Sequence, residues 1–250
     1  MFGKAKMAIH IGDIEAKFNK VVCQIGGDLV QNRLLSKSPG FENADYVFDK
    51  ENVIAELKVL RKNPSLESEL QKKIQAKFNK WMDQGKLVFY GQVRMESNNL
   101  PEEMQWELLR IYSEPVRRVI KKANKQIRDT KNQLKMPNAQ GLVIIVNDGN
   151  YTLQPEHFGF AAHQSLTTDY SSIHGVSLVT VNMEAKKAGV PTSLRIWMDY
   201  VRNGTDEIDP AFLLRLRTAW TQHYSSLAGE PIPTLNYAME DLSSLKYRKK

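Results

Sequence analysis

The run Gly-Leu-Val-Ile-Ile-Val at residues 141–146 constrains the fold more than any other feature of the chain. It is bounded by Pro137-Asn138 and by Asn147-Asp148-Gly149, which are residues typical of turns. A strand that is apolar at every position has both of its faces covered by other elements. The run is also far shorter than the roughly 20 apolar residues that cross a bilayer. We therefore expect a central strand in a layered structure, and no membrane partner.

The remaining apolar periodicity predicts helices and strands that alternate without regular βαβ repeats. Helical spacing extends over residues 13–35, where the Gly26-Gly27 pair is expected to kink or break the helix. Pro64, Pro101 and Pro115 each precede or open a further helical segment. The other predicted elements are strands at 43–49, 53–60, 86–95, 176–183 and 194–201 and helices at 156–167 and 210–227. These elements predict a single α/β domain over residues 1–250, with a central mixed sheet flanked by helices.

Composition narrows the class of protein further. The chain has 250 residues, of which 42% are hydrophobic and 25% charged, so it can bury a sizeable core and is not mainly disordered. Its one cysteine, Cys23, has no partner for a disulfide and no neighbour at zinc-site spacing. The first residues lack the apolar stretch of a secretory signal. These features lead us to expect a cytoplasmic protein.

Basic residues are concentrated in two places. The formal net charge is +7, and residues 114–135 hold eight basic side chains against Glu114 and Asp129. The last five residues add four more, which is also what a solvated, frayed terminus looks like. Within the inner cluster, four side chains at spacings of three and four predict a ridge along one helix face that follows nucleic-acid phosphates: Arg117, Lys121, Lys125 and Arg128. The alternative is that this ridge is only the solvated face of an amphipathic helix.

The strand at residues 53–60 carries two charged side chains among apolar neighbours. Glu56 and Lys58 point to the same face because alternate residues of a strand do so. Charged groups in such a strand require a partner, an ion or access to water. Asp45, across the predicted hairpin, can supply a second carboxylate. Together with the Leu57 carbonyl, these oxygens predict a site for Mg²⁺ or Mn²⁺.

This pattern resembles the PD-(D/E)xK superfamily of restriction-endonuclease-like nucleases. Asp45 matches the first acid, and Glu56-Leu57-Lys58 matches the ExK element. The resemblance implies a core formed by residues 13–61 and 114–148, a helical insertion over 62–113 and a C-terminal extension over 150–250. It also implies metal-dependent hydrolysis of DNA phosphodiester bonds, with defence or mobile-element biology as the family's usual setting. In that interpretation Asp45 and Glu56 bind the metal, Lys58 orients the attacking water, and Gln126 is the polar residue that the family places on the following helix.

Several alternatives stay open at this point. ExK also matches residues 15–17 and 184–186, but only the copy at Glu56 is flanked by apolar strand on both sides. Asp45, Glu56 and Lys58 are also compatible with a salt-bridged trio at a sheet edge. Glu15 and Asp28 are competing candidates for a further metal ligand.

Two other functional classes remain as alternatives to a nuclease. No HExxH, GxSxG, GxxxxGK[ST] or GxGxxG motif is present, which removes support from zinc catalysis, acyl transfer and nucleotide-driven chemistry. The first alternative is a catalytically inactive nuclease-like protein that binds nucleic acid or protein through residues 62–113. The second is a homo-oligomeric assembly component whose apolar stripe, from Leu66 to Trp81, is buried against another subunit.

Overall fold

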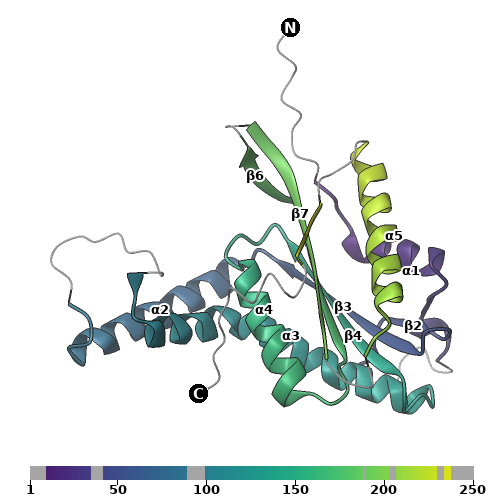
Figure 1. Ribbon diagram of the computed structural model, residues 1–250, viewed down its shortest axis with the longest axis horizontal. Coiled ribbons are helices and arrows are strands. Elements are labelled where there is room, and N and C mark those ends of the chain that lie inside the picture. The colour runs from purple at the N-terminus through teal and green to yellow at the C-terminus, as the bar shows by residue number, and fades with distance from the viewer. Residues whose placement is uncertain are drawn as a thin grey trace, which may run out of the picture.

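The fold is a mixed β-sheet covered by helices on both faces (Figure 1). The computed structural model describes residues 10–34, 42–88, 99–187, 190–202, 207–229 and 234–237. The strands follow the order β1-β2-β3-β4-β5-β7-β6, and β8 pairs with β7. Helices α1 (Ile14–Gln24) and α5 (Pro210–Ala228) cover one face, and α3 (Glu102–Gln133) and α4 (Pro155–Gln164) cover the other. The predicted α/β class, a central mixed sheet flanked by helices, is confirmed.

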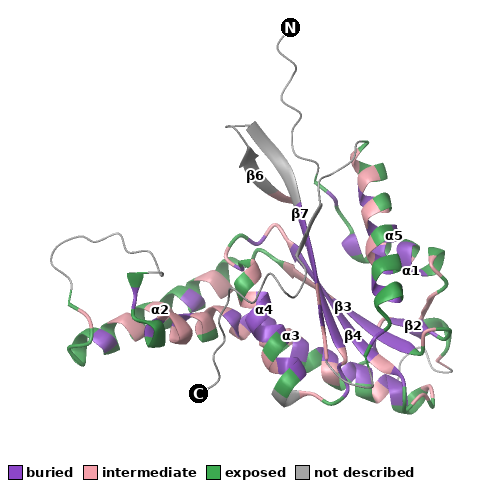
Figure 2. Cartoon of the chain, in the orientation of Figure 1, coloured by how far each residue is buried: buried purple, intermediate pink, exposed green. Residues whose placement is uncertain are grey.

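The apolar run at 141–146 forms the middle of the sheet. It lies in β4 (Gln140–Asp148), which pairs in parallel with β3 (Val53–Arg61) on one side and with β5 (Gly175–Val181) on the other. Ile144 packs toward α1 and α5, whereas Val143 and Ile145 pack toward α3 and α4. Figure 2 shows this part of the sheet buried. The prediction of a strand covered on both faces is therefore confirmed.

The predicted helix over 13–35 is interrupted at its glycine pair. Helix α1 ends at Gln24, Gly26 has a φ of 90°, and the short strand β1 (Asp28–Leu29) then pairs with β2 (Tyr46–Phe48). A Cβ on Gly27 would lie 2.5 Å from Cε1 of Phe48, so only glycine fits there. The remaining elements are η1 (Val30–Asn32), η3 (Ser165–Asp169), β6 (Met183–Lys187), β7 (Val190–Val201) and β8 (Thr234–Tyr237).

The prediction that Pro115 starts a separate helix is wrong. α3 is a single helix of 32 residues, and Pro115 lies inside it. An internal proline costs a helix one hydrogen bond and about 3 kcal/mol. Apolar packing on both sides offsets that cost, because Leu108 packs against α2 (Pro64–Asp83) and Val116 and Ile120 pack against the sheet.

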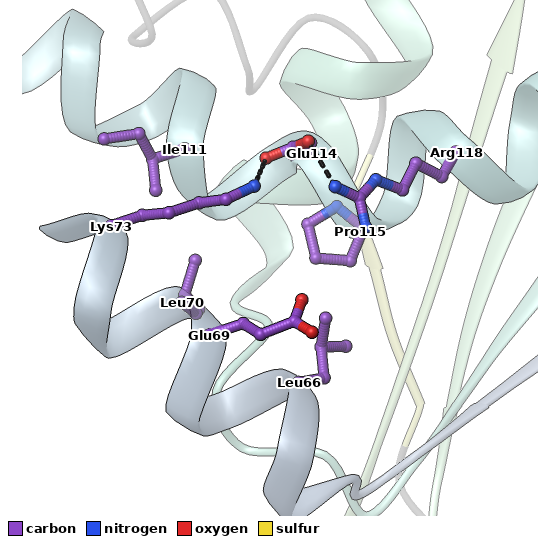
Figure 3. Close-up of a pocket in the computed structure, with 8 residues that line it drawn as sticks. All are labelled: Leu66, Glu69, Leu70, Lys73, Ile111, Glu114, Pro115 and Arg118. Carbon is purple, nitrogen blue, oxygen red and sulfur yellow. Dashed lines mark hydrogen bonds and ion pairs between the residues drawn. The ribbon is translucent and has the colours of Figure 1, made fainter.

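Helix α2 and residues 102–114 of α3 form a projection that we call the helical arm (Figure 1). Its own small core contains Trp81, Met104 and Leu108, and the Trp81 Nε1–H donates to Glu107 at 2.8 Å. In Figure 3, Glu114 lies between Lys73 of α2 and Arg118 of α3 and forms ion pairs with both. The arm buries Leu70 and Trp81 of the α2 stripe, whereas Leu66, Ile74 and Phe78 are half-buried. Packing of the stripe against another subunit stays a prediction.

Parts of some predicted features lie outside the described residues. These are most of the strand expected at 86–95 and the whole basic segment at 246–250. Residues 86–88, which are described, are not in a strand. Across the described part of the chain, no helix is both long enough and apolar enough to cross a membrane.

Candidate active site

A cavity of about 530 Å³ opens beside the β2–β3 hairpin. Residue Tyr46 of β2 pairs with Ala55 of β3, so β3 continues past the start of β2 and leaves an opening there. Helix α1, residues 29–31 and helix α3 supply the other walls. Five residues predicted for the site line this cavity: Asp45, Glu56, Leu57, Lys58 and Gln126.

The hairpin register brings the two predicted carboxylates together. Because Tyr46 pairs with Ala55, Asp45 lies opposite Glu56. Asp45 Oδ2 accepts a hydrogen bond from the Leu57 backbone N–H at 2.8 Å. The Glu56 side chain is only 2% exposed, and its Oε2 is buried without a hydrogen-bond partner among the described residues.

The two carboxyl groups affect each other's ionisation in opposite directions. Burial, followed by the charge of Asp45, raises the pKa of Glu56 to about 8. Burial also raises the pKa of Asp45, while the Leu57 N–H, a hydrogen bond with the Glu56 carboxyl group and the charge of Lys58 act in the opposite direction. The pair therefore retains a proton near neutral pH unless another positive charge takes its place.

Lys58 supplies a cation on the same face as Glu56. Its Nζ donates to Glu56 Oε1 at 2.5 Å and to Gln126 Oε1 at 2.7 Å. The Gln126 amide in turn donates from Nε2 to the Asn43 carbonyl at 2.9 Å. Gln126 thus connects the ammonium of β3 to the backbone that precedes Asp45.

Sequence reasoning missed a second contact between α3 and this backbone. Thr130 lies one helical turn beyond Gln126, is fully buried, and accepts the Ala44 N–H with Oγ1 at 2.8 Å. Together the two side chains fix residues 43–44 immediately before Asp45. The available signal was a threonine in an apolar helix stripe, because buried hydroxyl groups need partners.

The structure distinguishes between the two further acids considered from the sequence. Glu15 lies on α1, is exposed, and lines the cavity. Asp28 instead accepts hydrogen bonds from Asn32 at 2.9 Å and Arg33 at 3.0 Å, and it does not line the cavity. Glu15 is therefore the acid placed to join Asp45 and Glu56.

The donor set fits a hard divalent cation. No group of three or more His, Cys, Asp or Glu side chains suited to a metal occurs among the described residues. Mg²⁺ does not require such a group, because it is commonly held by one or two carboxylates and keeps several waters. The Glu56 and Asp45 carboxyl groups supply oxygens of this kind, and Leu57 lies on the same wall. These three residues would hold the ion.

The basic ridge lies outside the cavity. Lys121, Lys125 and Arg128 are exposed on α3, while Arg117 is half-buried. Contacts of the Glu42 carboxylate show which end of this ridge lies near the cavity. Lys122 pairs with Glu42 at 3.0 Å and lowers its pKa, and the charges of Lys58 and Lys125 add to that effect. Lys125 is therefore near the cavity, and the role of the ridge stays a prediction.

No family model, curated protein or solved structure matches this chain. The chemistry of the cavity therefore carries the functional proposal. Two carboxylates, an ammonium and an amide that converge in one cavity are suited to binding a divalent cation and an anionic substrate together.

Proposed function

We propose that the chain is a magnesium-dependent nuclease that hydrolyses phosphodiester bonds of DNA in the cavity at Asp45, Glu56 and Lys58. The observation that carries the proposal is the buried Glu56 carboxyl group beside Asp45 in a cavity that also holds the Lys58 ammonium. The resemblance of Asp45 and Glu56-Leu57-Lys58 to the PD-(D/E)xK pattern supports the same reaction.

Each side chain has a separate task in this reaction. Asp45 and Glu56 hold the metal ion, which when bound lowers the pKa of water and neutralises charge on the phosphate. Lys58 orients the attacking water and places positive charge where negative charge develops on the phosphate. Gln126 keeps the Lys58 ammonium in place through its 2.7 Å contact. Because Gln126 is itself held by the Asn43 carbonyl at 2.9 Å, Lys58 and Asp45 keep a fixed relation.

Substitution of the charged side chains tests this function directly. Purified full-length protein is incubated with labelled DNA in Mg²⁺, in Mn²⁺ or in EDTA. Glu56→Gln and Lys58→Met are each expected to lower the cleavage rate by about 100-fold or more, since each removes a charge that acts on the reacting phosphate. Lys62→Met is the matched control, because Lys62 is exposed just beyond the end of β3 and does not line the cavity.

Two results would remove the nuclease assignment. One is cleavage by Glu56→Gln and Lys58→Met at the rate of the unmodified chain. The other is salt-sensitive DNA binding with no cleavage in any divalent metal, which would instead support a catalytically inactive binding protein. Thermal unfolding of each variant shows whether a loss of activity reflects a loss of fold.

A further inference from the structure

We infer that this active site takes unpaired DNA, a single strand or an overhang, and rejects the paired duplex. The inference rests on the proposed nuclease function and specifies its substrate. It follows from the depth of the cavity, the stiffness of the duplex and the chemistry of the cavity walls.

Glu56 lies on the floor of the cavity, and the other two reactive groups, Asp45 and Lys58, are half-buried. Glu56, Leu57 and Gln126 are between 1% and 7% exposed. Glu15 and Gln31, which are exposed, form the rim. A phosphate must therefore pass the rim before it reaches the carboxylates.

A single strand can reach the carboxylates at a lower free-energy cost than a duplex can. Duplex DNA has a persistence length of about 150 base pairs, so it does not fold into a recess of this size. Extruding a nucleotide from the stack costs a few kcal/mol, whereas an unpaired strand avoids that cost. The volume of about 530 Å³ lies within the range that encloses a drug-sized ligand, and a nucleotide is of that size.

The cavity walls are suited to the edges and sugar of an exposed nucleotide. Amide side chains from four different segments line it: Asn19, Gln31, Asn43 and Gln126. These groups meet polar base edges that are occupied in a paired duplex. Lys121 and Lys125, exposed on α3, supply positive charge along the approach.

The test measures how fast the full-length protein cuts three labelled DNA substrates of the same sequence in Mg²⁺. They are a single strand, a blunt duplex and a duplex with a single-stranded overhang. We expect the single strand and the overhang to be cut at least about tenfold faster than the blunt duplex, which corresponds to more than 1.4 kcal/mol. Cuts in the third substrate are expected in the unpaired part. Equal or faster cutting of the blunt duplex would overturn the inference and leave the nuclease proposal standing.

A variant that obstructs the rim shows whether the single strand binds in the cavity or elsewhere on the surface. Gln31→Trp is expected to weaken single-strand binding in Ca²⁺, measured by fluorescence anisotropy, by about tenfold. Gln71→Trp, at an exposed position of α2, is the matched control and is expected to have no effect. If no substrate is cut at all, the nuclease proposal fails, and the same binding measurement made with the single strand and with the blunt duplex still decides the inference. Single-strand binding that Gln31→Trp leaves unchanged would overturn it.

Discussion

Glu56 makes the stability of the metal-free protein depend on pH. Its pKa is about 8 in the folded chain, compared with an ordinary value of 4.5, because it is buried beside Asp45. The folded state therefore binds this proton more tightly than the unfolded state does. The stability that this proton contributes is fully present below pH 4.5 and is lost as the pH rises through 8. In EDTA, we expect the melting temperature to fall between pH 6 and pH 9. Glu56→Gln, which stays neutral, should reduce that fall.

The same carboxylate links the proton to the metal ion. Mg²⁺ and the proton compete for Glu56, so Mg²⁺ should raise the melting temperature more at pH 8.5 than at pH 6. Glu56→Gln serves as the control and should show a weaker Mg²⁺ effect at both pH values. A Mg²⁺ stabilisation that is independent of pH and of Glu56 would contradict the assignment of this residue as a ligand.

Thr130 offers a test of how the segment before Asp45 is held. Thr130→Val keeps the shape of the side chain but leaves the buried Ala44 N–H without its acceptor. We expect a loss of about 1–3 kcal/mol in the free energy of unfolding, measured by urea denaturation. Thr130→Ser retains the hydroxyl group and is the control, with a smaller loss. Equal losses in the two variants would show that the methyl group, and not the hydrogen bond, carries the effect.

At the scale of residues, the sequence predicts contacts along one strand better than contacts between elements. Glu56 and Lys58 share a face because strand geometry requires it, and this could be predicted. The contacts of Thr130 with Ala44 and of Gln126 with the Asn43 carbonyl each join residues more than 80 positions apart. No local pattern encodes such distances.

Among the elements, helix α4 depends on a neutral histidine at its start. His157 Nδ1 accepts the Gln154 N–H at 2.9 Å, and the ring stacks on Tyr112 with centroids 4.7 Å apart. Burial lowers the pKa of His157 to about 4. Because the pKa is lowered, neutral His157 contributes to the stability of the fold above pH 6.5. This stability is lost as the pH falls toward 4.

Replacement of this histidine should reduce the acid sensitivity of the fold. Between pH 7.5 and pH 5, the His157 proton is expected to cost about 2 kcal/mol of folding stability. His157→Gln keeps a capping side chain at this position without a titratable ring, so it should lose less stability over that range. The measurement is urea denaturation at both pH values. His163→Gln, on the same helix, is the control and should keep the full acid sensitivity.

Element boundaries could be predicted where local chemistry is decisive. Asn63 caps α2 and accepts the Ser65 and Leu66 N–H groups, so the predicted start at Pro64 is confirmed. Pro115 misled the prediction because packing on both sides of it outweighs its helix-breaking cost. Strand β1 has two residues, too few for a periodic pattern to show.

For the molecule as a whole, the sheet order places the cavity beside the basic ridge of α3. β3 carries Glu56 and Lys58, and α3 crosses beside β3 on the return path to β4. Gln126 and Lys125 are neighbours on α3, so the helix that closes the cavity with one face presents positive charge on another. The proposed DNA strand would pass from the exposed lysines of α3 to the carboxylates along this crossover connection.

If DNA follows this path, its binding should depend on salt through particular lysines. Each phosphate contact with a single strand contributes about 0.7 to the slope of log affinity against log salt. Lys121→Gln with Lys125→Gln is expected to lower that slope by about 1.4, measured by fluorescence anisotropy over 50 to 200 mM salt. Lys72→Gln with Lys80→Gln, at exposed positions of α2 on the helical arm, is the control with the same change in net charge. An equal effect of both pairs would mean that DNA responds to the overall charge of +7 and not to the face beside the cavity.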